Sequence, residues 1–175
     1  MHQVRAKYIE AFIQSLAQRQ AQGQDVHPEI RFELPAAKRH ELYRLVVVDA
    51  IEKKPDGSHA AIRFTTSPIE ADYSGLPIVS PVTWEELTFR CRPMGFPEER
   101  VVVWGNRWIH DEAPPLGAQD GLTGIIHSVS QPELRNGLVE FRVDLGSAPL
   151  DAFEELLSLL AGHVEALLTY RAGAA

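Results

Sequence analysis

Histidines and carboxylates are the side chains of this sequence best suited to catalysis or metal binding. His59, His110 and His127 all fall in segments with the composition of β-strands, and Asp111 and Glu112 directly follow one of them. Imidazole and carboxylate groups that converge can bind zinc or a non-haem metal. None of these histidines has the His-x-His or His-x-x-x-His spacing that puts two ligands on one face of one element. We therefore expect no metal site and no cofactor. A small metal-dependent enzyme with a His/carboxylate cluster between residues 110 and 127 is the alternative to a binding protein.

Nucleophilic side chains are present without the surroundings that activate them. Ser74 and Ser147 lie in turn and helix-cap sequences, and neither sits in a Gly-x-Ser-x-Gly motif. Cys91 lies between two arginines, which lower the pKa of a nearby thiol. On a strand, however, those arginines point to the face opposite Cys91. We expect Cys91 to be a buried, inert thiol. As the single cysteine it also excludes an intramolecular disulfide.

Length and composition predict one domain, residues 1–175. With 45% hydrophobic and 23% charged residues, the chain can bury a core without a metal or a disulfide. A net charge of −7 argues against a nucleic-acid partner and permits a basic protein partner. No segment approaches the roughly 18 apolar residues of a membrane span, and the first residues do not resemble a signal peptide. We expect a cytoplasmic protein with no membrane partner.

Hydrophobic periodicity predicts an α+β fold. Apolar residues recur at i+4 through residues 2–22, which indicates an amphipathic helix. Residues 29–145 read as about 6–8 short strands joined by hairpins, because too few residues separate them for the crossover helices of a parallel sheet. Residues 149–170 have the pattern of a C-terminal helix. Both helices are expected to pack on one face of the antiparallel sheet.

One hairpin of the predicted sheet carries a specific register. Strands at residues 42–53 and 58–66 flank the turn sequence Pro55-Asp56-Gly57. A left-handed glycine in this turn would place Asp49 near Arg63.

The remaining chain is divided by two irregular segments. Residues 67–82 and 111–121 are rich in proline and glycine and are expected to be loops. A strand is predicted at residues 87–92, and a second hairpin from residues 122–130 and 138–145.

Residues 101–110 are predicted to form a hairpin whose turn is the Gly-Asn pair at its centre. One of its faces would carry Trp104, Arg107 and Ile109, and the other would carry Trp108. A sheet covered on one side needs only one apolar face, so the second is covered by a loop or binds a partner. Tryptophan beside arginine is typical of an interface hot spot.

These features favour a non-catalytic protein-binding domain, of the inhibitor or immunity type, that occludes a basic partner such as a toxin. Trp104, Arg107 and Ile109 would anchor the partner. Complementary negative charge would come from the irregular segments: Glu70, Asp72, Asp111, Glu112 and Asp120. Replacing Trp104 with alanine should then abolish partner capture and leave folding intact. A homodimer that buries the apolar hairpin face is a third reading.

Overall fold

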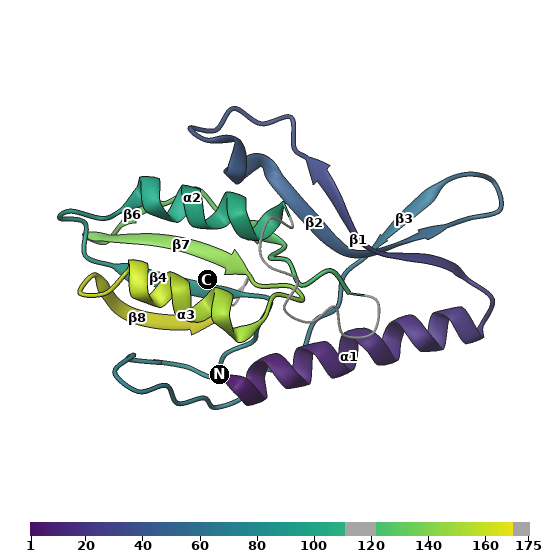
Figure 1. Ribbon diagram of the computed structural model, residues 1–175, viewed down its shortest axis with the longest axis horizontal. Helices are drawn as coiled ribbons and strands as arrows, with labels where there is room; N and C mark the ends of the chain where they lie inside the picture. Colours follow the sequence, from purple (N-terminus) through teal and green to yellow (C-terminus); the bar gives the residue numbers. More distant parts are fainter. Residues whose placement is uncertain (111–121, 170–175) are drawn as a thin grey trace.

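The computed structural model describes residues 1–110 and 122–169. In these ranges the chain forms three α-helices and an eight-stranded antiparallel sheet, which confirms the α+β class (Figure 1). The main strand order is β1-β2-β5-β7-β4-β8, with β3 beside β2 and β6 beside β7. In chain order the elements are α1 (His2–Ala21), β1 (Asp25–Glu33), the 3₁₀ helix η1 (Glu41–Arg44), β2 (Leu45–Lys53), β3 (His59–Ile62), β4 (Leu87–Cys91), α2 (Glu98–Ile109), β5 (Ser128–Val129), β6 (Glu133–Arg135), β7 (Leu138–Asp144), α3 (Leu150–Leu159) and β8 (Val164–Thr169).

The N-terminal helix forms where its apolar stripe predicts it. α1 lies along the part of the sheet made by β1, β2 and β3 (Figure 1). Tyr8 and Phe12 are fully buried on its inner side, and the Phe12 ring lies 4.9 Å from that of Phe64. Burial of this stripe, more than helix propensity, stabilises α1.

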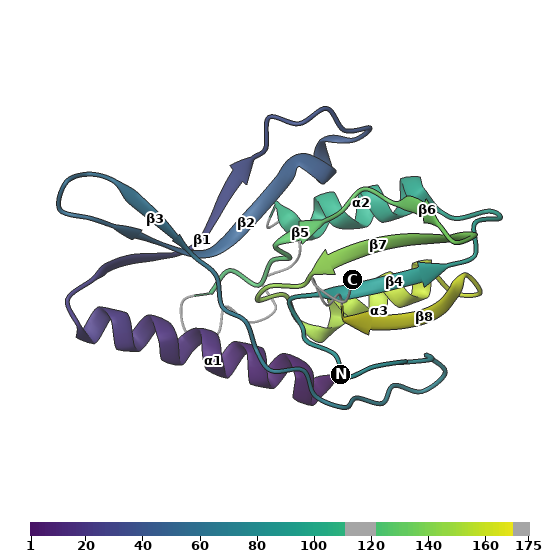
Figure 2. The ribbon, with the colours of Figure 1, turned by 180° about the vertical axis from the view of Figure 1, so that it is seen from behind.

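The other two helices cover one face of β7, β4 and β8. Seen from behind, these strands lie in front of α2 and α3, and no helix of residues 1–110 or 122–169 covers their second face (Figure 2). Phe89 of β4 contacts Phe141 of β7 and Phe153 of α3 at the centre of this core. Because β7 and β8 are both antiparallel to β4, α3 carries the chain across β4 in a split β-α-β arrangement.

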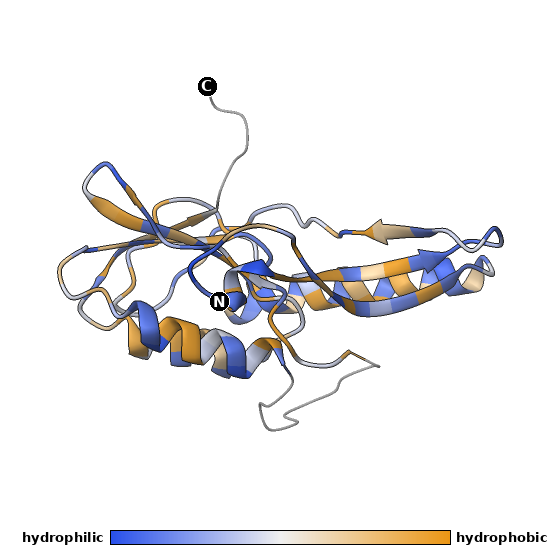
Figure 3. Ribbon diagram, turned by 90° about the horizontal axis from the view of Figure 1, so that it is seen from above, coloured by the Kyte–Doolittle hydropathy of each residue, from blue (hydrophilic) through white to orange (hydrophobic). Residues whose placement is uncertain are grey.

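The two parts of the sheet meet at a narrow junction. The β2–β5 ladder consists of the single pair Val46 and Ser128, supported by a 2.7 Å hydrogen bond from Val47 N–H to the His127 carbonyl. From above, β1, β2 and β3 extend away over α1, and hydrophobic and hydrophilic residues alternate along them (Figure 3). The junction therefore depends on side chains as well as on the ladder.

Two predictions for the sheet are confirmed. The β2–β3 ladder pairs Ala50 with Ile62 and Lys53 with His59, which is the register predicted from a left-handed Gly57. The strand expected at residues 87–92 is β4.

The hairpin predicted at residues 101–110 is wrong, because this segment is the helix α2. Its buried residues lie at helical spacing, with Val101, Trp104 and Trp108 on one face. Gly105 is not a turn residue: it is buried in the helix, and the Leu42 side chain occupies the space that a Cβ would need. β-propensity in the valine run is overridden by this tertiary packing.

The predicted C-terminal helix is wrong beyond residue 159. α3 ends there, and Gly162 adopts a left-handed φ of +79° that a helix cannot continue through. Residues 164–169 instead form β8, where Leu167 pairs with Phe89.

The limits of the sheet also differ from those expected. It begins at Asp25, before the predicted start at residue 29, and the strand predicted at 122–130 is reduced to Ser128–Val129. No helix in residues 1–110 or 122–169 is long and apolar enough to cross a membrane.

Candidate functional site

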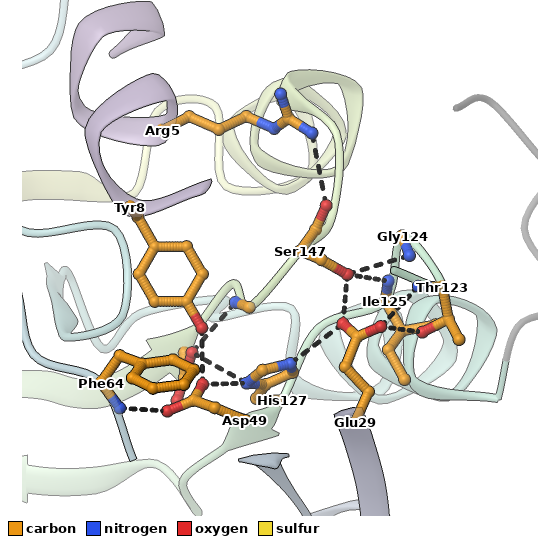
Figure 4. Close-up of polar contacts among 12 residues, drawn as sticks. Arg5, Tyr8, Glu29, Asp49, Phe64, Thr123, Gly124, Ile125, His127 and Ser147 are labelled. Carbon is orange, nitrogen blue, oxygen red and sulfur yellow. Dashed lines mark hydrogen bonds and ion pairs between the residues drawn. The ribbon is translucent and has the colours of Figure 1, made fainter. Parts of the chain in front are cut away.

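A buried charge cluster occupies the junction between the two parts of the sheet. His127 has no exposed surface, and its Nε2 lies 3.2 Å from Glu29 Oε1. Its Nδ1 lies 3.1 Å from Asp49 Oδ1 and 3.8 Å from Asp144 Oδ1. Figure 4 shows Glu29 and Asp49 on opposite sides of the imidazole ring. With a carboxylate at each ring nitrogen, the doubly protonated imidazolium is the favoured form.

Glu29 reaches this cluster through a local distortion of β1. The ladder pairs Pro28 with Ala50 and Ile30 with Val48, so the register continues unchanged past Glu29 and places it opposite Asp49. The φ of Glu29, +52°, is unusual for a residue with a side chain. Its carboxylate is buried in the cluster, and the backbone strain is offset by the bonds that the carboxylate makes.

Hydrogen bonds complete the coordination of both carboxylates. The Ser147 hydroxyl donates to Glu29 Oε1, and the Thr123 hydroxyl donates to Oε2 at 2.7 Å. On the other side, the Tyr8 hydroxyl donates to Asp49 Oδ1 at 2.6 Å (Figure 4).

The surroundings shift the pKa values of the cluster in different directions. Burial alone would lower the pKa of His127, but Asp144, Asp49 and Glu29 raise it to about 10. Burial would raise the pKa of Glu29, yet hydrogen bonds from His127 and Ser147 hold it below its ordinary value. Burial raises the pKa of Asp144 to about 7, a shift opposed by His127 and reinforced by Asp49.

The cluster has the geometry of a structural clamp and lacks that of a catalytic triad. Ser147 bonds to Glu29, and its oxygen also accepts from the backbone N–H groups of Gly124 and Ile125. Both ring nitrogens of His127 face carboxylates, and the side chain has no exposed surface through which a substrate could reach it. The clamp joins β1 and β2 to the residue that precedes β5 and to the end of β7.

The histidines singled out in the sequence have separate surroundings. His59 is exposed on β3, and His110 Nδ1 lies 2.5 Å from the Arg31 guanidinium. No group of three or more potential ligands in residues 1–110 and 122–169 could hold a metal ion. Asp111, Glu112 and Asp120 lie outside the described residues.

A groove of about 750 Å³ lies between α2 and α3 on the outer side of the molecule. Its apolar lining comes from Val103, which is 70% exposed, with Trp104 and Leu159. Four acids and two arginines surround this lining: Glu99, Asp151, Glu154, Glu155, Arg100 and Arg107. Carboxylates therefore outnumber cations around an accessible hydrophobic strip.

The groove walls are held together by polar contacts of one carboxylate. Glu155 of α3 accepts a hydrogen bond from the Trp108 indole N–H at 2.7 Å and one from Arg107 at 2.8 Å. The Arg107 guanidinium also lies 5.6 Å from the Trp108 ring centre. Trp104 donates its indole N–H to the Ala152 carbonyl at 3.0 Å. These contacts fix α2 against α3 and define the groove before any partner binds.

Comparison with protein-family models, with curated proteins and with solved structures finds no match to this chain. Geometry and chemistry are therefore the basis on which the sites are interpreted.

The predicted binding residues are distributed unevenly around this groove. Trp104 and Arg107 line it, although Trp104 is only 3% exposed. Ile109 is fully buried in the core and cannot contact a partner. Glu70 and Asp72 lie on the loop beside α3, where the neighbouring Tyr73 hydroxyl donates to Glu154 at 3.0 Å (Figure 1).

A second hollow, of about 430 Å³, lies on the sheet face that α2 and α3 leave uncovered. Charged residues of both signs line it, including Asp49, Asp144 and Arg63.

Sequence reasoning missed the charge cluster. Asp49 gave one usable sign, since it interrupts the apolar run Val46–Val48 within a strand whose two faces are both buried. An acid in such a position must find a partner. Its partners cannot be named from the sequence, because His127 is distant and the regular alternation of polar and apolar residues over 29–34 places Glu29 on the outer face of its strand.

Proposed function

We propose that this protein is a non-catalytic binding domain that occludes a basic partner protein through the groove between α2 and α3. The observation that carries the proposal is the exposed hydrophobic side chain of Val103 inside a rim of carboxylates. Together with Trp104 and Leu159 in the same groove, Val103 forms the kind of apolar strip within a polar rim that a protein interface buries.

The charge around the groove suits a cationic surface. Arg107 is neutralised by Glu155 at 2.8 Å. The three remaining acids of the rim outnumber its remaining arginine, Arg100, so the rim is negative. Complementary charge accelerates association and disfavours acidic competitors. The net charge of −7 extends the same preference to the whole molecule.

The loop at residues 67–82 enlarges this surface. The bond between Tyr73 and Glu154 joins the loop to α3, and Tyr73 also packs edge-on against Phe153 at 5.4 Å. Glu70 and Asp72 on this loop add further negative charge next to the rim. In this arrangement Val103 anchors the partner, Trp104 supports the groove floor, and the acids select a basic surface.

Occlusion is the mechanism that fits these parts, as in inhibitors and immunity-type proteins that block a toxin. The protein would supply a rigid acidic surface and no reactive group. We also propose a cytoplasmic location, because the single cysteine is a buried thiol with no disulfide partner.

A site-specific photocrosslinker tests the proposal in the native cell. Placed at Val103, it should capture one basic protein, whereas at Leu134, equally exposed at 70% on β6, it should not. With the captured protein purified, Val103→Asp should weaken binding by about 10-fold or more and Leu134→Asp should leave it unchanged. The affinity should also fall as salt concentration rises.

Two results would contradict the proposal. Equal capture from Val103 and Leu134 would show that the groove has no preference. A cross-link between two copies of the chain would identify the groove as a homodimer contact instead of a site for a basic partner.

A further inference from the structure

The hollow on the uncovered sheet face is formed by the divergence of the two sheet parts. β2 and β5 share one ladder pair, and β2 separates from β7 beyond this junction (Figure 2). Residues of both strands line a hollow of about 430 Å³. Leu87 and Phe89 of β4 face the helices, and Thr88 between them faces this space. A volume of this size is within the range of small-molecule sites, about 300–1,000 Å³.

Asp144 gives the hollow a carboxylate with unused capacity. Its side chain is 24% exposed, and it lines the hollow together with Asp49. Oδ1 accepts from the Gly146 N–H at 3.0 Å and lies 3.8 Å from His127, whereas Oδ2 has no partner among the described residues. Burial, Asp49 and Glu85 all disfavour the ionised form of Asp144. A cation bound at Oδ2 would relieve that penalty.

Thr88 supplies an independent sign of a missing partner. Its residue is 4% exposed, and its hydroxyl has no hydrogen bond in the part of the chain that the structure describes. A buried hydroxyl without a partner costs about 1–3 kcal/mol. Because Thr88 lines the same hollow as Asp144, one donor group could bond to both oxygens.

Arg63 adds the opposite charge. It follows β3, lines the hollow and has no ion pair or hydrogen bond with another described residue. An arginine fork is suited to binding a carboxylate with two parallel hydrogen bonds. The hollow thus offers acceptors at its floor and a cationic donor at its side.

We propose that this hollow binds a small zwitterion of the amino-acid class, with its ammonium group at Asp144 and Thr88 and its carboxylate at Arg63. An ammonium group carries three donors and no acceptor, which matches two acceptor oxygens on neighbouring strands. The site lies on the sheet face opposite the α2–α3 groove, and it is independent of the function proposed for that groove.

Isothermal titration with the twenty common amino acids tests the proposal, with ethylamine and propionate as probes that each carry one of the two charges. At least one amino acid should bind, and each single-charge probe should bind at least about 10-fold more weakly. Binding should strengthen from pH 5.5 to 8 as Asp144 ionises beside Asp49, Glu85 and His127. The same titration should show proton release in buffers of different ionisation heat.

Variants separate binding from folding. Asp144→Asn should abolish the proton release and weaken binding by about 10-fold or more. Thr88→Val keeps the side-chain shape and removes the unpartnered hydroxyl, so it should weaken binding with an unchanged or raised melting temperature. Val103→Asp in the other groove should have no effect on amino-acid binding. Failure of all twenty amino acids to bind, or undiminished binding to Asp144→Asn, would overturn the proposal.

Discussion

His127 and Glu29 form an ion pair between two side chains with no exposed surface, 98 residues apart in the chain, with 3.2 Å between Nε2 and Oε1. The pair joins β1 to the residue that precedes β5, at the point where β2 and β5 share one ladder pair. At this junction the ion pair therefore supplies stabilisation that the single ladder pair between β2 and β5 does not. The stability of the whole fold should depend on it.

The free energy of unfolding should fall when the pH drops below about 4, and it should fall again as the pH rises from about 4.5 towards 10. Glu29 has a native pKa below its ordinary 4.5, so its stabilisation is present above that value and lost on acidification. His127, with a pKa of about 10 against 6.5, stabilises fully below pH 6.5 and loses this effect as the pH rises towards 10. Asp144, with a pKa of about 7 against 3.8, removes stability as the pH rises between those values. Urea unfolding from about pH 3 to 10 measures the curve, and constant stability between about pH 7 and 9 would show that native His127 is uncharged.

Glu29→Gln should destabilise the protein by about 3–5 kcal/mol, because it leaves charged groups buried without their partner. Glu33→Gln is the matched control on the same strand, since Glu33 is 48% exposed and pairs with Arg44 at the surface. That substitution should cost less than about 1 kcal/mol. Urea unfolding at pH 6 gives both values. Similar losses for the two variants would mean that the buried pair contributes no more than a surface one.

The sequence predicts the elements whose contacts are local. α1 follows from an apolar stripe at i+4, and the β2–β3 register follows from Gly57. The segment of α2 has helical spacing as well as β-forming residues, and its Gly-Asn pair favoured the wrong choice. Leu42, the residue that requires Gly105, is far away in sequence and carries no sign of this contact.

The candidate sites were harder to predict because they join distant segments. Trp104 and Arg107 do line a groove, but they do so from a helix and against α3, which no hairpin interpretation contains. The charge cluster depends on the left-handed backbone conformation of Glu29, and nothing in the composition of this strand predicts that conformation. Pattern analysis assigns such a residue to the wrong face.

Gly146→Ala should destabilise the protein far more than Gly124→Ala. Both glycines have positive φ, +49° and +80°, so each alanine adds the strain of a left-handed residue, about 1–2 kcal/mol. Around Gly124 the space for a Cβ is open, whereas at Gly146 the new Cβ would overlap the His127 ring. Displacing that ring breaks its ion pairs, so the difference between the two variants should exceed about 2 kcal/mol. Equal stability losses in thermal unfolding would show that the ring can move aside without cost.

Trp104→Ala should unfold the protein more readily, contrary to what an exposed hairpin residue would do. The indole is 3% exposed and donates to the Ala152 carbonyl, so its removal leaves a cavity and an unpaired acceptor and should cost about 3–5 kcal/mol. The adjacent Val103 is 70% exposed, and Val103→Ala should change stability by less than about 0.5 kcal/mol. Urea denaturation of the two variants measures the contrast. If Trp104→Ala proved as stable as Val103→Ala, α2 would not depend on this contact with α3. In that case α2 could move relative to α3, and a loss of partner binding in Val103→Asp could result from movement of α2 as well as from the lost contact.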